Sequence, residues 1–107
     1  MGPKSYVYLI RVEETDMYKV GVSSDPQKRC ERLQRGLYPS LTLAYIIPTD
    51  VPEMIERRLR LSYRRFRISG DLFYLDAERL ARIEAEGWPL LSIPGPFAPS
   101  ALLIGQE

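Results

Sequence analysis

The sequence contains no histidine, and its single cysteine is Cys30. Without histidine, Ser-His-Asp and Cys-His catalysis are impossible, and so are metal sites that need imidazole ligands. One thiol excludes an internal disulfide and every cysteine-rich zinc site. Any hydrolytic chemistry in this protein must therefore use tyrosine, lysine, arginine, aspartate or glutamate.

Long apolar runs are also missing. No apolar stretch approaches about 18 residues, so no segment is predicted to span a membrane. The first ten residues, MGPKSYVYLI, lack the apolar core of a signal peptide, which favours a cytoplasmic location. The 107 residues are 45% hydrophobic, which is typical of a globular chain with room for one domain and one core.

Charge is unevenly distributed along the chain. The net charge is only +1, but residues 1–70 carry 13 basic and 8 acidic side chains, whereas residues 71–107 carry 2 basic and 6 acidic ones. A basic body with an acidic end favours an anionic ligand that is held on one side. A solvated surface with a chance asymmetry is the alternative that charge alone leaves open.

Periodicity and turn residues predict a mixed α/β (α+β) domain. Segments rich in Tyr, Val, Leu and Ile predict strands over residues 5–12, 17–22, 41–48 and 72–75. Helical spacing predicts helices over residues 26–35, from 52 to the break at Ser69 and Gly70, and from 77 to about 86. We expect a small three-stranded antiparallel sheet flanked by helices, in a domain of residues 1–87. The Pro-rich apolar tail, residues 88–107, is expected to pack on this domain or to bind a partner.

Each predicted helix is preceded by residues that favour helix initiation. Ser24 with Gln27 and Asp50 with Glu53 form capping-box patterns before the first two helices. Asp76 is placed to cap the third helix. These residues predict where the three helices begin.

The first two strands are predicted to form a hairpin, which fixes the side chains that share a face. If the turn EETD places Val12 opposite Met17, Tyr8 lies opposite Gly21. Lys19 then lies diagonally from Tyr8 on the same face, within reach of it. Because Gly21 has no side chain, we expect an empty spot beside the phenol that could seat a water and a phosphate. A plain tyrosine–lysine pair on a half-buried sheet is the alternative.

These residues resemble the motifs of the GIY-YIG endonuclease superfamily, in its phage and bacterial branch with K-[IV]-G in place of YIG. The first motif matches YVYLI, with Tyr8 at the family's first tyrosine. The second motif matches YKVG, with Lys19 and Gly21 at its key positions. The family's arginine, eight residues after that glycine, corresponds to Arg29.

The later part of the chain continues the resemblance. The segment EMIERRLRLSYRRFRISGDLF matches the branch pattern E-x₆-aromatic, then R-x₂-G-[DE]-x-F. The matching residues are Glu56, Tyr63, Arg67, Gly70, Asp71 and Phe73. The resemblance covers residues 6–80, about three-quarters of the chain, and implies a GIY-YIG-like fold and metal-dependent cleavage of DNA.

The resemblance also implies a role for each motif residue. Tyr8 would be the general base that activates water, and Lys19 would supply a cation that favours its ionised form. Arg29 would bind the scissile phosphate, because its guanidinium fork matches two phosphate oxygens. Glu56 would hold Mg²⁺ or Mn²⁺, since one carboxylate with waters and phosphate oxygens suffices for magnesium. Gly21 belongs to the structural part of the motifs, as does Gly70.

Simpler structural roles exist for the same residues. Glu56 is spaced for an i,i+4 salt bridge with Arg60, and Arg29 could pair with Asp25. Tyr8 could be a core or edge tyrosine, and Lys19 a solvated strand lysine. Five further side chains are candidate phosphate contacts or plain surface: Lys28, Arg32, Arg60, Arg64 and Arg67.

Two other functions remain open from the sequence. A catalytically weak or inactive domain of the same fold could bind nucleic acid or a protein partner, because fold does not fix function. An interaction domain with no nucleic-acid role is the third reading. The expected partners are therefore DNA and, through the tail, a protein.

Overall fold

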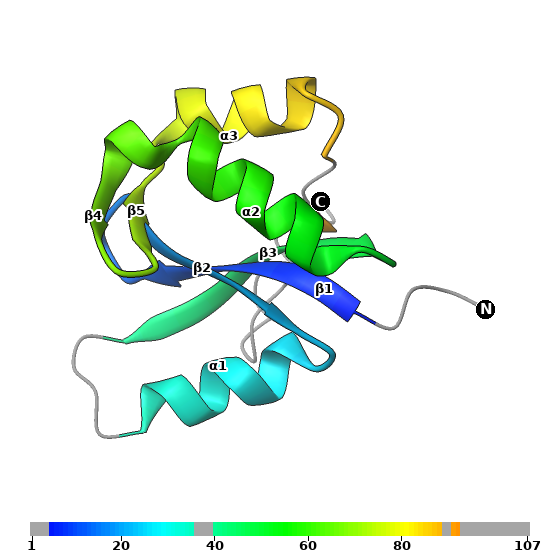
Figure 1. Ribbon diagram of the computed structural model, residues 1–107. Helices are drawn as coiled ribbons and strands as arrows, with labels where there is room; N and C mark the ends of the chain where they lie inside the picture. Colours follow the sequence, from blue (N-terminus) through cyan, green and yellow to red (C-terminus); the bar gives the residue numbers. More distant parts are fainter. Residues whose placement is uncertain (1–4, 36–39, 89–90, 93–107) are drawn as a thin grey trace, which may run out of the picture.

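A computed structural model describes residues 5–35, 40–88 and 91–92. Helices and strands alternate along the chain in the mixed order that the sequence predicts (Figure 1). The elements are β1 (Ser5–Val12), β2 (Met17–Ser23), α1 (Pro26–Gln34), β3 (Leu41–Thr49), α2 (Pro52–Ser62), the 3₁₀ turn η1 (Arg64–Phe66), β4 (Arg67–Ser69), β5 (Leu72–Tyr74), α3 (Ala77–Ala85) and β6 (Leu91–Ser92).

The strands form one antiparallel sheet in the order β4-β5-β2-β1-β3-β6. The three predicted long strands are its centre, and three short strands extend it to six. In Figure 1, α2 and α3 lie over one face of the sheet and α1 lies under the other. The α/β prediction of an antiparallel sheet flanked by helices is confirmed.

The central strand β1 is buried on both faces. Val7 and Leu9 face the α2–α3 side, whereas Tyr8 and Ile10 face α1, and none of the four is more than 2% exposed. The larger cluster, on the α2–α3 side, adds Tyr18, Val20, Ile47, Leu59, Tyr63, Phe73, Leu75 and Ile83. The smaller cluster, on the α1 side, adds Cys30 and Leu43. The helices therefore pack on the sheet through apolar contacts on each side. Burial of these apolar surfaces is the main driving force for the fold.

The hairpin register is the predicted one. Tyr8 lies opposite Gly21 in the β1–β2 ladder. The turn that sets this register is held by Thr15, whose hydroxyl donates to the Val12 carbonyl at 2.7 Å and accepts from the Met17 N–H at 3.0 Å. Because strand side chains alternate between faces, a slip of one residue would move the Tyr8 face to the other side of the sheet.

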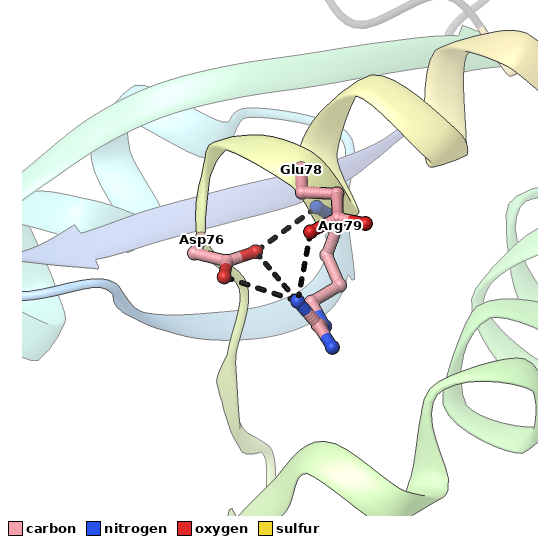
Figure 2. A network of polar contacts seen from close by, with 3 residues as sticks. All are labelled: Asp76, Glu78 and Arg79. Carbon is pink, nitrogen blue, oxygen red and sulfur yellow. Dashed lines mark hydrogen bonds and ion pairs between the residues drawn. The ribbon is translucent and has the colours of Figure 1, made fainter.

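The three helices begin at the predicted residues, but two of the three predicted N-caps are wrong. Asp25, not Ser24, caps α1 by accepting from the Lys28 N–H at 3.1 Å. Helix α2 has Val51 at its N-cap and no side-chain cap, so Asp50 does not serve there. The third N-cap is confirmed, because the Asp76 carboxylate accepts from the Arg79 N–H at 3.0 Å (Figure 2).

Helix α2 is shorter than its apolar pattern predicts. It ends at Ser62, and the next residues form η1 and then β4, which pairs with β5. Gly70 adopts a φ of 47° in the β4–β5 turn, a conformation that favours glycine. Pairing with β5 satisfies backbone groups of residues 67–69, and this tertiary interaction overrides the local helical pattern.

Part of the predicted tail belongs to the fold. Leu91 and Ser92 pair with Ile46 and Tyr45 of β3, and Trp88 packs against the larger cluster. The other residues beyond Trp88 lie outside the described part of the chain. Among the helices that the structure describes, none has the length and hydropathy needed to cross a membrane.

Candidate functional site

Two of the predicted site residues meet on the α1 face of the sheet. Arg29, one turn into α1, donates from Nε to the Tyr8 hydroxyl on β1 at 3.4 Å. Tyr8 is only 2% exposed, because α1 covers its ring. The hydrogen bond to Tyr8 raises the pKa of the Arg29 guanidinium further above its ordinary value. A cation is therefore held within hydrogen-bond distance of the phenol oxygen.

Gly21 is the reason that the phenol can occupy this place. A methyl group at Gly21 would overlap with the hydroxyl and ring of Tyr8. The space above Gly21 is thus filled by the phenol itself, which corrects the expectation of an empty spot for water and phosphate. Glycine here permits close packing of a ring on the backbone.

Lys19 shares this face of the sheet but has a different partner. Its Nζ lies 3.4 Å from Oδ1 of Asp71, and no hydrogen bond joins it to Tyr8. Asp71 also interacts electrostatically with Arg29. The residues around the phenol are therefore two cations and one carboxylate, and Arg29, not Lys19, is the cation bonded to Tyr8.

Asp71 is the site residue that the sequence-based prediction missed. It follows Gly70 in the turn between β4 and β5, and β5 pairs with β2 at Lys19. The G-[DE]-x-F pattern contained it, but local periodicity gave no reason to place it beside a strand 52 residues earlier.

Glu56 approaches the sheet from the opposite side. Its Oε2 accepts from Nε of Arg60 at 2.6 Å, the i,i+4 salt bridge that was the alternative to metal binding. Nη2 of Arg60 in turn donates to the Val20 carbonyl at 3.2 Å. No hydrogen bond or ion pair joins Glu56 to Tyr8, Lys19 or Arg29 in the described part of the chain. The structure therefore gives two groups, Tyr8–Arg29 with Lys19–Asp71, and Glu56–Arg60.

The outer edge of β2 links these two groups. Strand β5 pairs with β2 only at Met17–Lys19, so the edge beyond it is available to other groups. There the Val20 N–H donates to the Asp71 carbonyl at 2.9 Å, and the Val20 carbonyl accepts from Arg60. Both groups are thus anchored to the same residue of β2 from opposite faces of the sheet.

A comparison with protein-family models assigns the chain to a family. The model described as the T5orf172 domain matches residues 5–85, from the start of β1 to the end of α3. The chain belongs to the T5orf172 domain family. This family is associated with nucleases. Comparisons with curated proteins and with solved structures gave no significant match.

The T5orf172 domain has limited means of holding a metal. No group of three or more Cys, Asp or Glu side chains gathers among residues 5–35 and 40–88. The Glu56 side chain is 21% exposed, so solvent reaches it, although Arg60 occupies one of its oxygens. An accessible carboxylate oxygen is a ligand that magnesium accepts together with waters and phosphate oxygens. The residues therefore fit a single-carboxylate site.

The candidate phosphate contacts of the T5orf172 domain are spread over two regions. Lys28 and Arg32 are exposed on α1, and Arg64 and Arg67 are exposed in η1 and β4. Arg60 is half-buried and already bonded to Glu56 and to Val20. Cys30 of α1 is buried in the smaller cluster, and this burial raises the pKa of its thiol.

Proposed function

We propose that this T5orf172 domain is a metal-dependent DNA endonuclease of the GIY-YIG type. The single observation that supports this most is the hydrogen bond from Arg29 to the Tyr8 hydroxyl above Gly21. These three residues come from three separate motifs of the resemblance, and a plain surface role for each would not bring them together.

In this proposal the deprotonated phenol oxygen of Tyr8 takes a proton from the attacking water and becomes a hydroxyl. The Arg29 guanidinium, bonded to the phenol, stabilises the phenolate that must accept this proton. When a phosphodiester binds, the same guanidinium can donate to its non-bridging oxygens and stabilise the charge that develops in the transition state. Because the Tyr8 ring is buried, only its hydroxyl end can meet the water, which restricts the direction of attack.

Glu56 would hold the metal ion, Mg²⁺ or Mn²⁺. A bound divalent cation would supply charge neutralisation at the phosphate and at the leaving oxygen. The salt bridge of Glu56 with Arg60 competes with this ligation, so Arg60 would act as a positioning residue that releases one carboxylate oxygen when the metal arrives. Lys19 and Asp71 would border the same region and set its local charge.

DNA is the proposed partner. Lys28 and Arg32 lie on the same helix as Arg29 and would contact neighbouring backbone phosphates. Arg64 and Arg67 would extend the basic surface beyond the β2 edge. The cytoplasmic location and a protein partner for the tail stay predictions, since the tail lies mostly outside the described residues.

One observation favours a second candidate, a domain that binds nucleic acid without cutting it. Glu56 is paired with Arg60 and has no bond to the Tyr8–Arg29 pair. If this pairing keeps the carboxylate from binding a metal when DNA is bound, the basic side chains alone would give a binding domain.

A plasmid-nicking assay separates the two candidates. We expect cleavage with Mg²⁺ that stops in EDTA and in Glu56→Gln, whereas Glu53→Gln, an exposed glutamate on the same helix, keeps its activity. Cleavage by Glu56→Gln at the wild-type rate would remove Glu56 from the mechanism. Intact DNA binding with no cleavage by the wild-type protein would favour the second candidate.

Variants of the Tyr8–Arg29 pair test the base. Tyr8→Phe should slow single-turnover cleavage by about 10²- to 10⁴-fold, the usual share of general-base catalysis, with DNA binding unchanged. Tyr74→Phe, an exposed tyrosine on β5, is its matched control. Arg29→Ala should reduce both cleavage and binding, whereas the exposed Arg57→Ala should reduce neither by much. A Tyr8→Phe variant that cleaves normally would show that tyrosine is not the base.

A further inference from the structure

Asp71 is the carboxylate that lies among the cations of the candidate site. Its Oδ1 is 3.4 Å from Nζ of Lys19. Its negative charge also acts on the guanidinium of Arg29, and that guanidinium donates to the Tyr8 hydroxyl. One acidic side chain therefore interacts with both cations beside the phenol.

The main chain places Asp71 at this position. Its carbonyl accepts a hydrogen bond from the Val20 N–H of β2 at 2.9 Å. The next residue, Leu72, begins β5, which lies beside β2 and pairs there with Lys19 (Figure 1). Because both interactions use backbone groups, they do not depend on which side chain stands at position 71. The sheet itself thus holds the carboxylate next to Lys19.

Lys19 has a flexible side chain that such a partner can restrict. In the sheet it lies directly opposite Ile10 on one side and Leu72 on the other, so apolar groups flank its stem. The ammonium group at the end of this stem is free to rotate unless a carboxylate holds it. It has three donors, so the hydrogen bond to Asp71 leaves others for a second acceptor.

Both members of this ion pair are accessible to a substrate. The Lys19 side chain is 24% exposed, and that of Asp71 is 37% exposed. A phosphodiester that accepts from Arg29 would lie near Asp71, and therefore near the ammonium group that Asp71 holds. Two cations on one phosphate stabilise more of the charge that develops in the transition state than one cation does.

We propose that Asp71 is a positioning residue, which holds the Lys19 ammonium group beside Arg29 so that both cations bind the same phosphodiester. This inference rests on the proposed function, because it concerns the same site and the same substrate. It gives Asp71 a role through Lys19 and no contact of its own with DNA. A carboxylate that merely neutralised Lys19 would have the opposite effect on DNA binding, so the two roles can be separated.

A first double-mutant cycle measures single-turnover cleavage at saturating DNA. Asp71→Asn and Lys19→Met should each slow cleavage by roughly tenfold, the effect of losing a hydrogen bond to a charged group. The double variant should be no slower than Lys19→Met alone, because Asp71 acts only through Lys19. Asp71→Glu keeps the charge and should retain most of the rate. Asp50→Asn, which changes an exposed aspartate before α2, should cleave as the wild type does.

A second cycle measures oligonucleotide binding in EDTA, so it needs no cleavage. Lys19→Met should weaken binding by roughly tenfold in the wild-type background, because one charged contact to a phosphate is lost. In the Asp71→Asn background it should weaken binding much less, because an unrestrained ammonium group no longer stays at the phosphate. A larger effect of Lys19→Met in that background would show that Asp71 masks Lys19, and it would overturn the proposal.

Urea unfolding separates positioning from a structural role. Asp71→Asn should be nearly as stable as the wild type, because its bond to Val20 uses the main chain and a partly exposed ion pair contributes little to stability. A large loss of stability in both Asp71→Asn and Asp71→Glu would contradict the proposal.

The two cycles also separate this inference from the nuclease proposal. Coupling between Asp71 and Lys19 in DNA binding, in a protein that does not cut DNA, would leave the positioning role standing without the nuclease. Normal metal-dependent cleavage in which the effects of Asp71→Asn and Lys19→Met simply multiply would leave the nuclease standing and remove the positioning role.

Discussion

Replacing Gly21 by alanine tests whether close packing of the Tyr8 phenol on β2 is a defining feature of the site. In an ordinary strand position, glycine to alanine stabilises a protein by about 0.4–1 kcal/mol, because it restricts the unfolded chain. At Gly21 the new methyl would overlap with the hydroxyl and ring of Tyr8, which is 2% exposed and packed under α1. We therefore expect the opposite sign.

The size of the effect follows from overpacking. The ring must move away from β2, and forcing an extra methyl into a packed core costs about 1–3 kcal/mol. The movement also carries the hydroxyl away from Arg29, so the 3.4 Å hydrogen bond should break. We expect Gly21→Ala to lower the free energy of unfolding by about 1–3 kcal/mol and to abolish cleavage.

A double-mutant cycle in urea unfolding isolates the cause. Tyr8→Leu removes the outer ring atoms and hydroxyl that the methyl would meet, so Gly21→Ala should cost nothing in the Tyr8→Leu background. The coupling energy should therefore equal most of the cost measured in the wild type. Equal destabilisation by Gly21→Ala in both backgrounds would refute this reasoning and would place the strain in the backbone of β2.

Three further predictions concern charge. Hydrogen bonds from the Arg79 backbone N–H and guanidinium lower the pKa of the Asp76 carboxyl. The ionised carboxylate therefore stabilises the fold at pH values above the ordinary aspartate pKa. Asp76→Ala should destabilise the protein at neutral pH, and the difference from wild type should vanish as acid titrates the carboxyl; a constant difference down to pH 2 would contradict this. Arg60→Gln frees Glu56 and should lower the Mg²⁺ concentration needed for half-maximal cleavage; an unchanged requirement would show that the salt bridge does not compete with the metal. DNA affinity should fall with salt at a log–log slope of about −0.9 per phosphate contacted, and an affinity that ignores salt would favour a protein partner.

Local pattern predicted much of this protein because the relevant interactions lie close together along the chain. A four-residue turn and the alternation of strand side chains sufficed to place Tyr8 opposite Gly21. The Asp76 cap and the limits of the long strands follow from the same short-range rules. The Asp25 cap was missed by one residue, and the absence of a side-chain cap on α2 has no local signature.

The end of α2 shows where local pattern fails. Apolar residues continue at helical spacing to Phe66, yet the helix ends at Ser62, because residues 67–69 pair with β5. Backbone pairing with a neighbouring strand outweighs a helical preference of a few tenths of a kcal/mol per residue.

Composition, periodicity and turn residues predicted the mixed α/β class and the hairpin correctly, and the family resemblance gave a hypothesis for the residues that a nuclease of this kind would use. The distant partners came from the tertiary structure: Arg29 with Tyr8, 21 residues apart, and Lys19 with Asp71, 52 residues apart. The Glu56–Arg60 pair follows from helical spacing, and the fold places it on the other face of the sheet. Strand and helix periodicities describe which way a side chain faces within its own element. They carry no information about which distant element packs there, because that is set by how apolar surfaces of the whole chain are buried together.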